Sequence, residues 1–364
     1  MAAHSFFSCQ SQIDQDVFID DDGQAYIYYG GWGHANVALL NEDMTSFGTF
    51  PDGQTFKEIT PEGYVEGAQM LKRNGKYIFM WSEGELCLPS LRSLSKALLG
   101  GWTGPDYAVS YAIADSPLGP FNRQAKILAQ DSAVATGSGH NGVLNVPGTD
   151  IYYIIYHRRP LGETDGNHRV LCYDRMYFEE DGTIRPIVME VQDDFSDGQM
   201  IAWKTYGGGW EVKDEKALVA SLSAGGKAML NTNFGDQVFD ADVTLTGAAD
   251  GGNADAGVVF RATGLGVGAD AYTGYYAGLS PHGYVVLGKA NGGWQRLATT
   301  NVTVDLGTTY HLRVTAIGSD ISVYLGSDTT PKITVSDSSY SSGANGLRVF
   351  ETEASFAKIS VAKP

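Results

Sequence analysis

A hairpin pattern that recurs three times in the first half of the chain restricts its fold more than any other feature. Each copy consists of an apolar strand, a tight turn and an aromatic strand. The copies occupy residues 17–29, 70–81 and 143–156. Turn pairs such as Asp22-Gly23 and Asn74-Gly75 supply the positive φ angles that hairpins need. Copies at intervals of roughly 50 to 70 residues predict the blades of a β-propeller, each a small antiparallel sheet.

The number of copies predicts an incomplete propeller. Propellers usually close with about four blades or more, because an open ring leaves sheet faces and edges unburied. Three copies are visible over residues 1–191. We therefore expect this domain to be a partial propeller that lacks its first blade or blades.

The second half of the chain has a different pattern. From Asp193 onward, alternating strands are separated by clusters of Gly, Asn, Asp and Ser. Roughly ten short strands at this spacing predict a β-sandwich over residues 192–364. The composition agrees with an all-β chain, since 46 Gly and 20 Tyr residues accompany only 18% charged residues.

Charge and cysteine content restrict the function. A formal net charge of −17 argues against nucleic-acid binding, which depends on Lys and Arg at phosphates. No apolar run reaches the length of a membrane span, and the start lacks the pattern of a signal peptide. The chain is therefore either cytosolic or lacks its true start. Cys9, Cys87 and Cys172 match no zinc pattern, and one disulfide is possible but not required.

One segment interrupts the propeller pattern. Residues 85–100 separate Trp81-Ser82-Glu83-Gly84 from Gly101-Trp102 in an otherwise continuous passage. Two interpretations stay open: a loop with a short helix, or an intron retained in a eukaryotic gene model. Sequencing the transcript distinguishes them.

Two carboxylates precede successive copies of the hairpin. Asp14 lies just before the first copy and Glu66 just before the second. Equivalent positions on neighbouring blades bring such side chains toward the propeller axis. Cleavage of an acetal needs one group that protonates the leaving oxygen and another that activates water. The alternative is that both are exposed acids in turns.

Several short motifs follow one another in the first half of the chain. They are residues 13–26, 65–67, 81–84, 116–121, 139–143, 156–159 and 181–184. In this order they resemble glycoside hydrolase family 43, with Gln15 where this family usually has Pro. The resemblance covers about residues 10–190 and implies a five-bladed β-propeller that hydrolyses O-glycosyl bonds with inversion.

The resemblance implies catalytic roles. Glu66 corresponds to the general acid, which needs a raised pKa, and Asp14 to the carboxylate that holds and tunes it. The general base of the family is an Asp on the first blade, and no residue here occupies its place. Asp16 and Asp20 are not substitutes, because Asp20 belongs to the turn and Asp16 sits beside the tuning residue. We therefore expect an incomplete enzyme.

The resemblance also implies substrate and metal contacts. His140 matches a histidine that points into the central channel toward a cation or water; calcium there would rely mostly on waters, and no cofactor is required. Arg169 resembles an arginine that reaches sugar hydroxyls, with Arg158 as its rival. Trp81 and Trp32 could stack on a sugar, or belong to the core.

The second half resembles concanavalin/laminin-G-like sandwiches (jelly-roll), including carbohydrate-binding module family 66. We expect Arg261, Tyr276 and Trp294 to contact sugar. The motifs are residues 194–198, 256–261, 274–278, 291–294 and 346–350.

Two functional hypotheses follow. The first is an extracellular, monomeric exo-glycosidase on plant or fungal polysaccharide or oligosaccharide, either an α-L-arabinofuranosidase or a β-xylosidase. The second is a catalytically inactive, truncated propeller that only binds carbohydrate. Neither nucleic acid nor a membrane is an expected partner.

Overall fold

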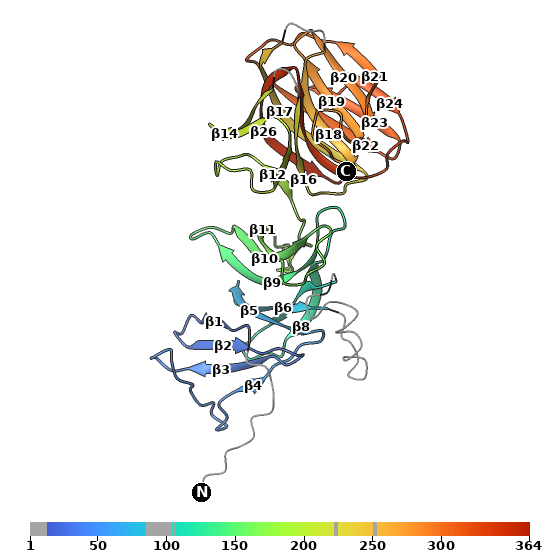
Figure 1. Cartoon of the computed structure of the whole chain (residues 1–364). Coiled ribbons are helices and arrows are strands. Elements are labelled where there is room, and N and C mark those ends of the chain that lie inside the picture. Colours follow the sequence, from blue (N-terminus) through green and yellow to red (C-terminus); the bar gives the residue numbers. More distant parts are fainter. Residues whose placement is uncertain (1–12, 85–103, 105, 222–224, 250–252) are drawn as a thin grey trace. The chain divides into compact units, whose positions relative to one another are not determined.

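The computed structural model describes residues 13–84, 104, 106–221, 225–249 and 253–364. Within these ranges all regular secondary structure consists of β-strands, which confirms the all-β fold class (Figure 1). The chain divides into two compact units, Met1–Met189 and Glu190–Pro364. The described residues contain no helix long and apolar enough to cross a bilayer. Residues 85–100, for which a loop or a retained intron was considered, lie outside the described part.

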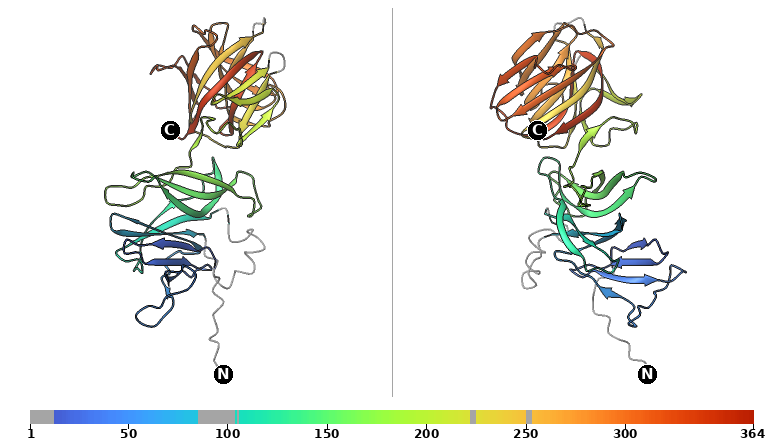
Figure 2. Two further views of the ribbon diagram at one scale, coloured as in Figure 1. Left: turned by 90° about the vertical axis from the view of Figure 1, so that its left-hand side faces the viewer. Right: turned by 180° about the vertical axis from the view of Figure 1, so that it is seen from behind.

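The first unit contains three antiparallel sheets, and each includes one of the predicted hairpins (Figure 2). In chain order the hairpins are β1–β2, β5–β6 and β9–β10. The first sheet has the order β1-β2-β3-β4, the second β5-β6-β7-β8 and the third β11-β10-β9. The strands are β1 (Asp16–Ile19), β2 (Ala25–Tyr29), β3 (Asn36–Leu40), β4 (Lys57–Glu58), β5 (Glu66–Arg73), β6 (Lys76–Glu83), β7 (Ala108–Ala114), β8 (Asn122–Leu128), β9 (Ala135–Asn145), β10 (Tyr152–Pro160) and β11 (Val170–Met176).

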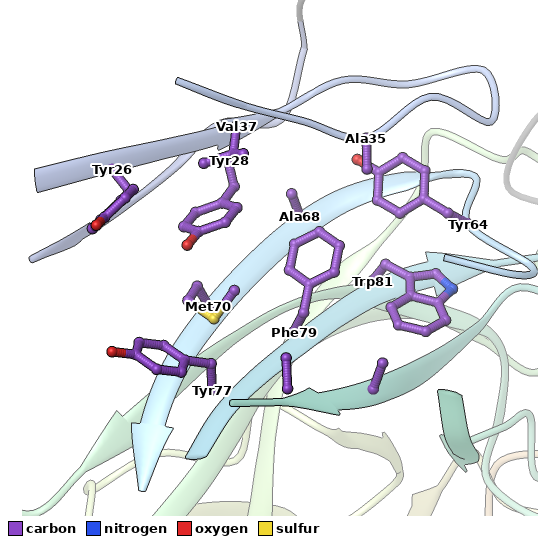
Figure 3. Close-up of a cluster of buried hydrophobic side chains, with 12 residues drawn as sticks. Tyr26, Tyr28, Ala35, Val37, Tyr64, Ala68, Met70, Tyr77, Phe79 and Trp81 are labelled. Atoms are coloured by element: carbon purple, nitrogen blue, oxygen red, sulfur yellow. The ribbon is translucent and has the colours of Figure 1, made fainter. Parts of the chain in front are cut away.

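The first two sheets pack face to face through aromatic side chains (Figure 3). Tyr28 from β2 and Phe79 from β6 are fully buried, with ring centroids 5.7 Å apart. Trp81, expected to stack on a sugar, is also fully buried in this cluster. That expectation was wrong, because a ring enclosed by the neighbouring sheet has no free face.

Two acids of the first hairpin tie these sheets together. The Asp16 carboxylate accepts hydrogen bonds from the backbone N–H of Met70 at 2.7 Å and from Gln69 Nε2 at 3.0 Å. Asp20 forms an ion pair with Lys72 at 2.5 Å, and the Tyr77 hydroxyl donates to the same carboxylate. Both side chains therefore hold sheets together.

The outer sheets of the first unit expose apolar side chains. Val17 and Ile19 alternate along β1 with Phe18, which packs against the core. Leu171 and Tyr173 on β11, the edge strand of the third sheet, are 79% and 71% exposed. Alternate positions of a strand point to opposite faces, so the edge strands β1 and β11 each present exposed apolar side chains on one face.

The second unit is a β-sandwich, as expected. One sheet has the order β14-β15-β26-β17-β22-β23-β24, with β12 also paired to β26, and the other β13-β16-β25-β18-β19-β20-β21. Alternate residues of β17, such as Phe239 and Val243, are fully buried. The strands are β12 (Val191–Asp193), β13 (Trp203–Tyr206), β14 (Gly209–Lys213), β15 (Lys216–Ser221), β16 (Gly226–Leu230), β17 (Gln237–Ala248), β18 (Asp255–Thr263), β19 (Thr273–Ser280), β20 (Tyr284–Asn291), β21 (Trp294–Asn301), β22 (Thr309–Ile317), β23 (Asp320–Leu325), β24 (Ile333–Ser336), β25 (Ala344–Phe350) and β26 (Thr352–Ala362).

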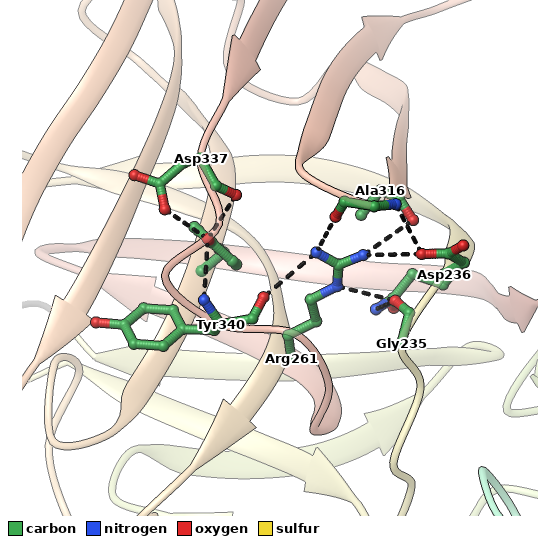
Figure 4. A network of polar contacts seen from close by, with 9 residues as sticks. Gly235, Asp236, Arg261, Ala316, Asp337 and Tyr340 are labelled. Carbon is green, nitrogen blue, oxygen red and sulfur yellow. Dashed lines mark hydrogen bonds and ion pairs between the residues drawn. The ribbon is translucent and has the colours of Figure 1, made fainter.

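Arg261 joins loops of the sandwich and does not face a ligand (Figure 4). Its guanidinium is 1% exposed, forms an ion pair with Asp236, and donates to backbone carbonyls. These carbonyls belong to Gly235, Ala316, Gly318 and Tyr340. The expectation of a sugar contact was therefore wrong for Arg261, because its donors are already used inside the domain.

Tyr276 is also a structural residue. Its ring is fully buried, and its hydroxyl donates to Asp255 Oδ1 at 2.9 Å. Arg348 lies over the ring at 4.4 Å from the centroid. A sugar therefore cannot reach Tyr276, and the expected contact was wrong.

Trp294 is only partly buried. Its ring meets that of Tyr276 edge to face with centroids 5.7 Å apart, so the outer side of the Trp294 ring remains accessible.

Candidate active site

Glu66 occupies the first position of β5, where a bulge displaces it from the regular ladder. The register between β5 and β6 shifts by one residue between Glu66 and Gln69. Gly67, with φ of 71°, makes this bulge possible. A Cβ at Gly67 would lie 2.8 Å from Ser82 Oγ, so a larger residue would push the strands apart.

The surroundings of Glu66 suit a carboxyl group that keeps its proton. Burial raises the pKa of Glu66, a hydrogen bond from Tyr107 lowers it, and the negative charge of Asp14 raises it further. The charges of His140 and Arg169 act in the lowering direction. The net direction is upward, which is the direction a general acid requires.

Asp14 and His140 come together beside Glu66. His140 Nδ1 lies 3.7 Å from Asp14 Oδ2, and the two side chains are 42% and 21% exposed. Both residues have left-handed backbones, with φ of 58° at Asp14 and 49° at His140. Non-glycine residues rarely adopt this conformation, and where they do it often aims a functional side chain.

Two residues that sequence reasoning did not select complete the surroundings of Glu66. Tyr107, 1% exposed, donates a hydrogen bond of 2.7 Å from its hydroxyl to Glu66 Oε1. Ser82, which pairs with Glu66 across β5 and β6, accepts a hydrogen bond of 2.8 Å from the backbone N–H of His140, and it acts to lower the pKa of Tyr107. Ser82 stands in the motif of residues 81–84, so its position was a usable signal. Tyr107 lies seven residues after the interrupting segment 85–100, where no pattern marks it.

The two arginine candidates lie in different places. Arg169 is exposed and close enough to Glu66 for its charge to lower the pKa of that carboxyl, against the larger effect of burial. Arg158 lies near Cys172 instead: burial raises the pKa of the Cys172 thiol, and the charge of Arg158 opposes this rise. Arg169 is thus the arginine that accompanies the Glu66 cluster.

Trp32 lies in a loop that adjoins both carboxylates. Gly30 donates from its backbone N–H to Ile13 O at 3.0 Å, and Gly33 donates to Val65 O at 3.1 Å. The loop is therefore tied to the residues that precede Asp14 and Glu66. Trp32 is 40% exposed, so part of its ring is available to a ligand.

His140 does not form a metal site with its described neighbours. Within the described ranges, no group of three or more His, Cys, Asp or Glu side chains is arranged to hold a metal ion. One imidazole beside one carboxylate is a poor fit for calcium, which prefers six to eight oxygen ligands. We assign no step of a reaction to a cation here.

Comparisons with known proteins match each half of the chain separately. The model of glycosyl hydrolases family 43 matches residues 2–184, half of the chain. The model of a 3-keto-alpha-glucoside-1,2-lyase-like domain matches residues 190–362. Both matches agree with the two compact units of the fold.

Among curated proteins, a beta-D-galactofuranosidase of Aspergillus niger is 48% identical over 176 residues, which cover 48% of this chain and 45% of that protein. A beta-xylosidase of Xylanibacter ruminicola is 26% identical over 179 residues, covering 40% of this chain and 48% of that protein. The chain thus spans about half the length of these relatives.

Among solved structures, an alpha-L-arabinofuranosidase of Clostridium thermocellum is 26% identical, with a TM-score of 0.37 over 50% of this chain and 54% of that one. The carbohydrate-binding module CBM66 of Bacillus subtilis is 26% identical, with a TM-score of 0.39 over 44% of this chain and 96% of that one. The family match, the three hairpin-built sheets and the Glu66 cluster lead to one conclusion: this chain belongs to glycosyl hydrolase family 43.

Proposed function

We propose that the protein is an exo-acting glycosidase in which Glu66 is the general acid. The observation that carries this proposal is the Glu66 carboxyl itself, half-buried beside Asp14 with its pKa raised. Glu66 delivers its proton to the glycosidic oxygen as the bond to the anomeric carbon breaks. Burial favours the protonated form of Glu66, and the negative charge of Asp14 adds to this effect by like-charge repulsion. This proton transfer needs no cofactor.

The water that attacks the anomeric carbon needs a carboxylate base on the opposite face of the sugar. We propose that this base belongs to a blade that residues 1–191 lack. The exposed apolar side chains of Val17 and Ile19, and of Leu171 and Tyr173, support this proposal, because further blades would cover them. A propeller completed in this way would bring the base toward the axis that Glu66 faces.

The substrate class we propose is a terminal furanoside or pentoside of plant or fungal polysaccharide. The candidates are α-L-arabinofuranosides and β-xylosides, together with β-D-galactofuranosides. The 48% identity to the Aspergillus galactofuranosidase favours the last. A β-D-galactofuranoside and an α-L-arabinofuranoside share the same ring configuration, so one pocket that tolerates a longer exocyclic chain could accept both.

For the second unit we propose a carbohydrate-binding role that holds the enzyme on its polymer. Trp294 is the aromatic side chain that supports this role, because it is partly exposed at the end of a hairpin. We propose further that the protein acts outside the cell as a monomer, where polysaccharide is available. Catalytically inactive carbohydrate binding is the second candidate function, favoured by the partly exposed Trp294 of the second unit.

Release of p-nitrophenol from the three glycosides tests for turnover, and hydrolysis of the corresponding methyl glycosides tests the general acid, because methoxide needs a proton to leave and p-nitrophenolate does not. Glu66→Gln should lower kcat/KM on the methyl glycosides by roughly 10²- to 10⁴-fold, the usual contribution of general acid–base catalysis. Glu62→Gln is a matched control, since Glu62 is exposed four residues earlier on the same segment and should retain activity.

The outcomes separate the two candidate functions. If Glu66→Gln is as active as the unchanged protein on the methyl glycosides, Glu66 is not the acid. If the folded, unchanged chain releases nothing from any glycoside yet is retarded on an arabinoxylan or galactofuranan affinity gel, binding alone is its function.

A further inference from the structure

Tyr107 is the residue in direct contact with Glu66 that neither the sequence motifs nor the family resemblance assigns a role. Its hydroxyl donates to Glu66 Oε1 at 2.7 Å, while the ring is 1% exposed. Tyr107 lies just before β7, so this contact links the start of β7 to Glu66 at the start of β5. A buried tyrosine whose single hydroxyl proton is given to one carboxylate oxygen fixes the orientation of that carboxylate.

Ser82 supports the same side of the site. The backbone N–H of His140 donates to Ser82 Oγ at 2.8 Å, and Ser82 is fully buried. Burial raises the pKa of the Tyr107 hydroxyl, and Ser82 acts in the lowering direction. Ser82 therefore belongs to the buried surroundings of the Tyr107 hydroxyl that donates to Glu66.

Packing fixes the Tyr107 ring from two sides. A Cβ on Gly139 would come within 2.3 Å of the ring, so the absence of a side chain there makes room for it. His157 stacks on the ring with centroids 5.8 Å apart and planes 14° apart. The Nε2 atom of His157 is buried, and within the described ranges it has no hydrogen-bond partner. The His157 imidazole therefore supports the Tyr107 ring by stacking and not through a hydrogen bond from Nε2.

The protonation state of His157 agrees with a packing role. Burial, with the charges of Arg169, His140 and Arg159, lowers the pKa of His157 to about 4. The ring is therefore neutral near pH 6 and adds no positive charge beside Tyr107. A neutral stacking partner adds no charge that competes with Glu66 for the Tyr107 hydroxyl.

From these contacts we infer that Tyr107 is a positioning residue that holds the Glu66 carboxyl in one orientation, supported by Ser82 and His157. This inference rests on the general-acid role proposed for Glu66. A carboxyl group that rotates freely would present its proton to the glycosidic oxygen only part of the time, whereas a bond to Oε1 leaves Oε2 directed at the substrate.

The inference predicts how Glu66 titrates. The ionisable groups that face Glu66 are Asp14, His140, Arg169 and the Tyr107 and Tyr64 hydroxyls. A hydrogen bond from Tyr107 stabilises the charged carboxylate, so its removal must raise the titration midpoint of Glu66. The other groups stay in place in a Tyr107→Phe variant, which isolates the effect of this one bond.

The test is a carbon-13 NMR titration of the whole chain labelled at the glutamate carboxyls, with the Glu66 signal assigned by its loss in Glu66→Gln. Tyr107→Phe should move the Glu66 midpoint upward. Tyr64→Phe is the matched control: the Tyr64 hydroxyl, buried in the same site, donates to Gly30 O at 2.7 Å and not to Glu66, so the midpoint should stay unchanged. An unchanged midpoint in Tyr107→Phe overturns the inference.

A second pair of variants covers the case in which Tyr107→Phe does not fold. His157→Phe keeps the stack on Tyr107 and should leave the Glu66 midpoint where it is. His157→Ala removes the stack and should raise the midpoint, since the Tyr107 ring loses its support. Equal midpoints in these two variants overturn the role of the stack. None of these titrations needs turnover, so they remain decisive if the glycosidase proposal fails in the p-nitrophenol assay.

Discussion

Replacement of Phe79 by Ala would remove the ring at the centre of the packing between the first two sheets. Phe79 is fully buried, and four aromatic rings lie within 6.1 Å of its centroid. They belong to Tyr28, Tyr64, Trp81 and Phe121. Truncation of a buried Phe to Ala costs about 3–5 kcal/mol, because transfer energy is lost and a cavity remains. We expect the free energy of unfolding of the first unit to fall by this amount.

The position of Phe79 connects this stability to the candidate site. Asp14 precedes the first sheet and Glu66 begins the second, so the contact between the sheets sets their separation. Loosening that contact should reduce the effect of Asp14 on Glu66. The sandwich has its own core and should keep its stability.

Hydrogen exchange measured by mass spectrometry in increasing urea distinguishes the two units. In Phe79→Ala, peptides from β2 and β6 should lose protection at lower urea, while peptides from β17 and β18 should not change. Phe56→Ala is the control, since Phe56 is 42% exposed and its loss should cost less than about 1 kcal/mol. Unchanged protection of β2 and β6 in Phe79→Ala would refute the assignment of this aromatic cluster as the link between the sheets.

Three further predictions follow from the sites described above. Asp14→Asn removes a negative charge that raises the pKa of Glu66, so the Glu66 midpoint should move to lower pH in the NMR titration, and the alkaline limb of any pH–rate profile should move with it. Trp32→Ala should raise KM by roughly tenfold with little change in kcat, if the exposed ring binds sugar before and during the reaction alike. Arg261→Met should lower the free energy of unfolding of the sandwich by about 3 kcal/mol in urea denaturation, because buried carbonyl groups lose their donor. Arg261→Lys should not restore this stability, because an ammonium group lacks the planar, forked set of donors of a guanidinium.

Features that depend on local chemistry could be predicted from the sequence alone. The turn pairs Asp22-Gly23 and Asn74-Gly75 located two hairpins, and alternation of apolar residues located the strands of the sandwich. Asp14 and Glu66, which precede successive hairpins, do lie beside each other near the ends of neighbouring sheets. These features are encoded within about ten residues of chain.

Features that depend on packing between distant segments could not be predicted in the same way. Trp81 lies within β6 whichever neighbour covers that strand, and only the packing of the first sheet decides that its ring is buried. Arg261 lies at a bulge in β18, with φ of 49°, where the register against β25 shifts between Val259 and Ala262. Such a shift changes the face to which a side chain points, and the motif that suggested a sugar contact for Arg261 does not reveal it.

The open edge at β11 has a consequence for handling the protein in solution. In the described part of the chain, β11 pairs with β10 on one side only, and its other edge is a template on which a second chain can add a strand, which is the first step of aggregation. The exposed Leu171 and Tyr173 side chains would favour such an addition. The net charge of −17 opposes this encounter by repulsion between copies. Salt screens that repulsion over roughly 8–10 Å at physiological ionic strength. Colloidal stability should therefore be highest in dilute buffer well above the isoelectric point and should decline as salt is added.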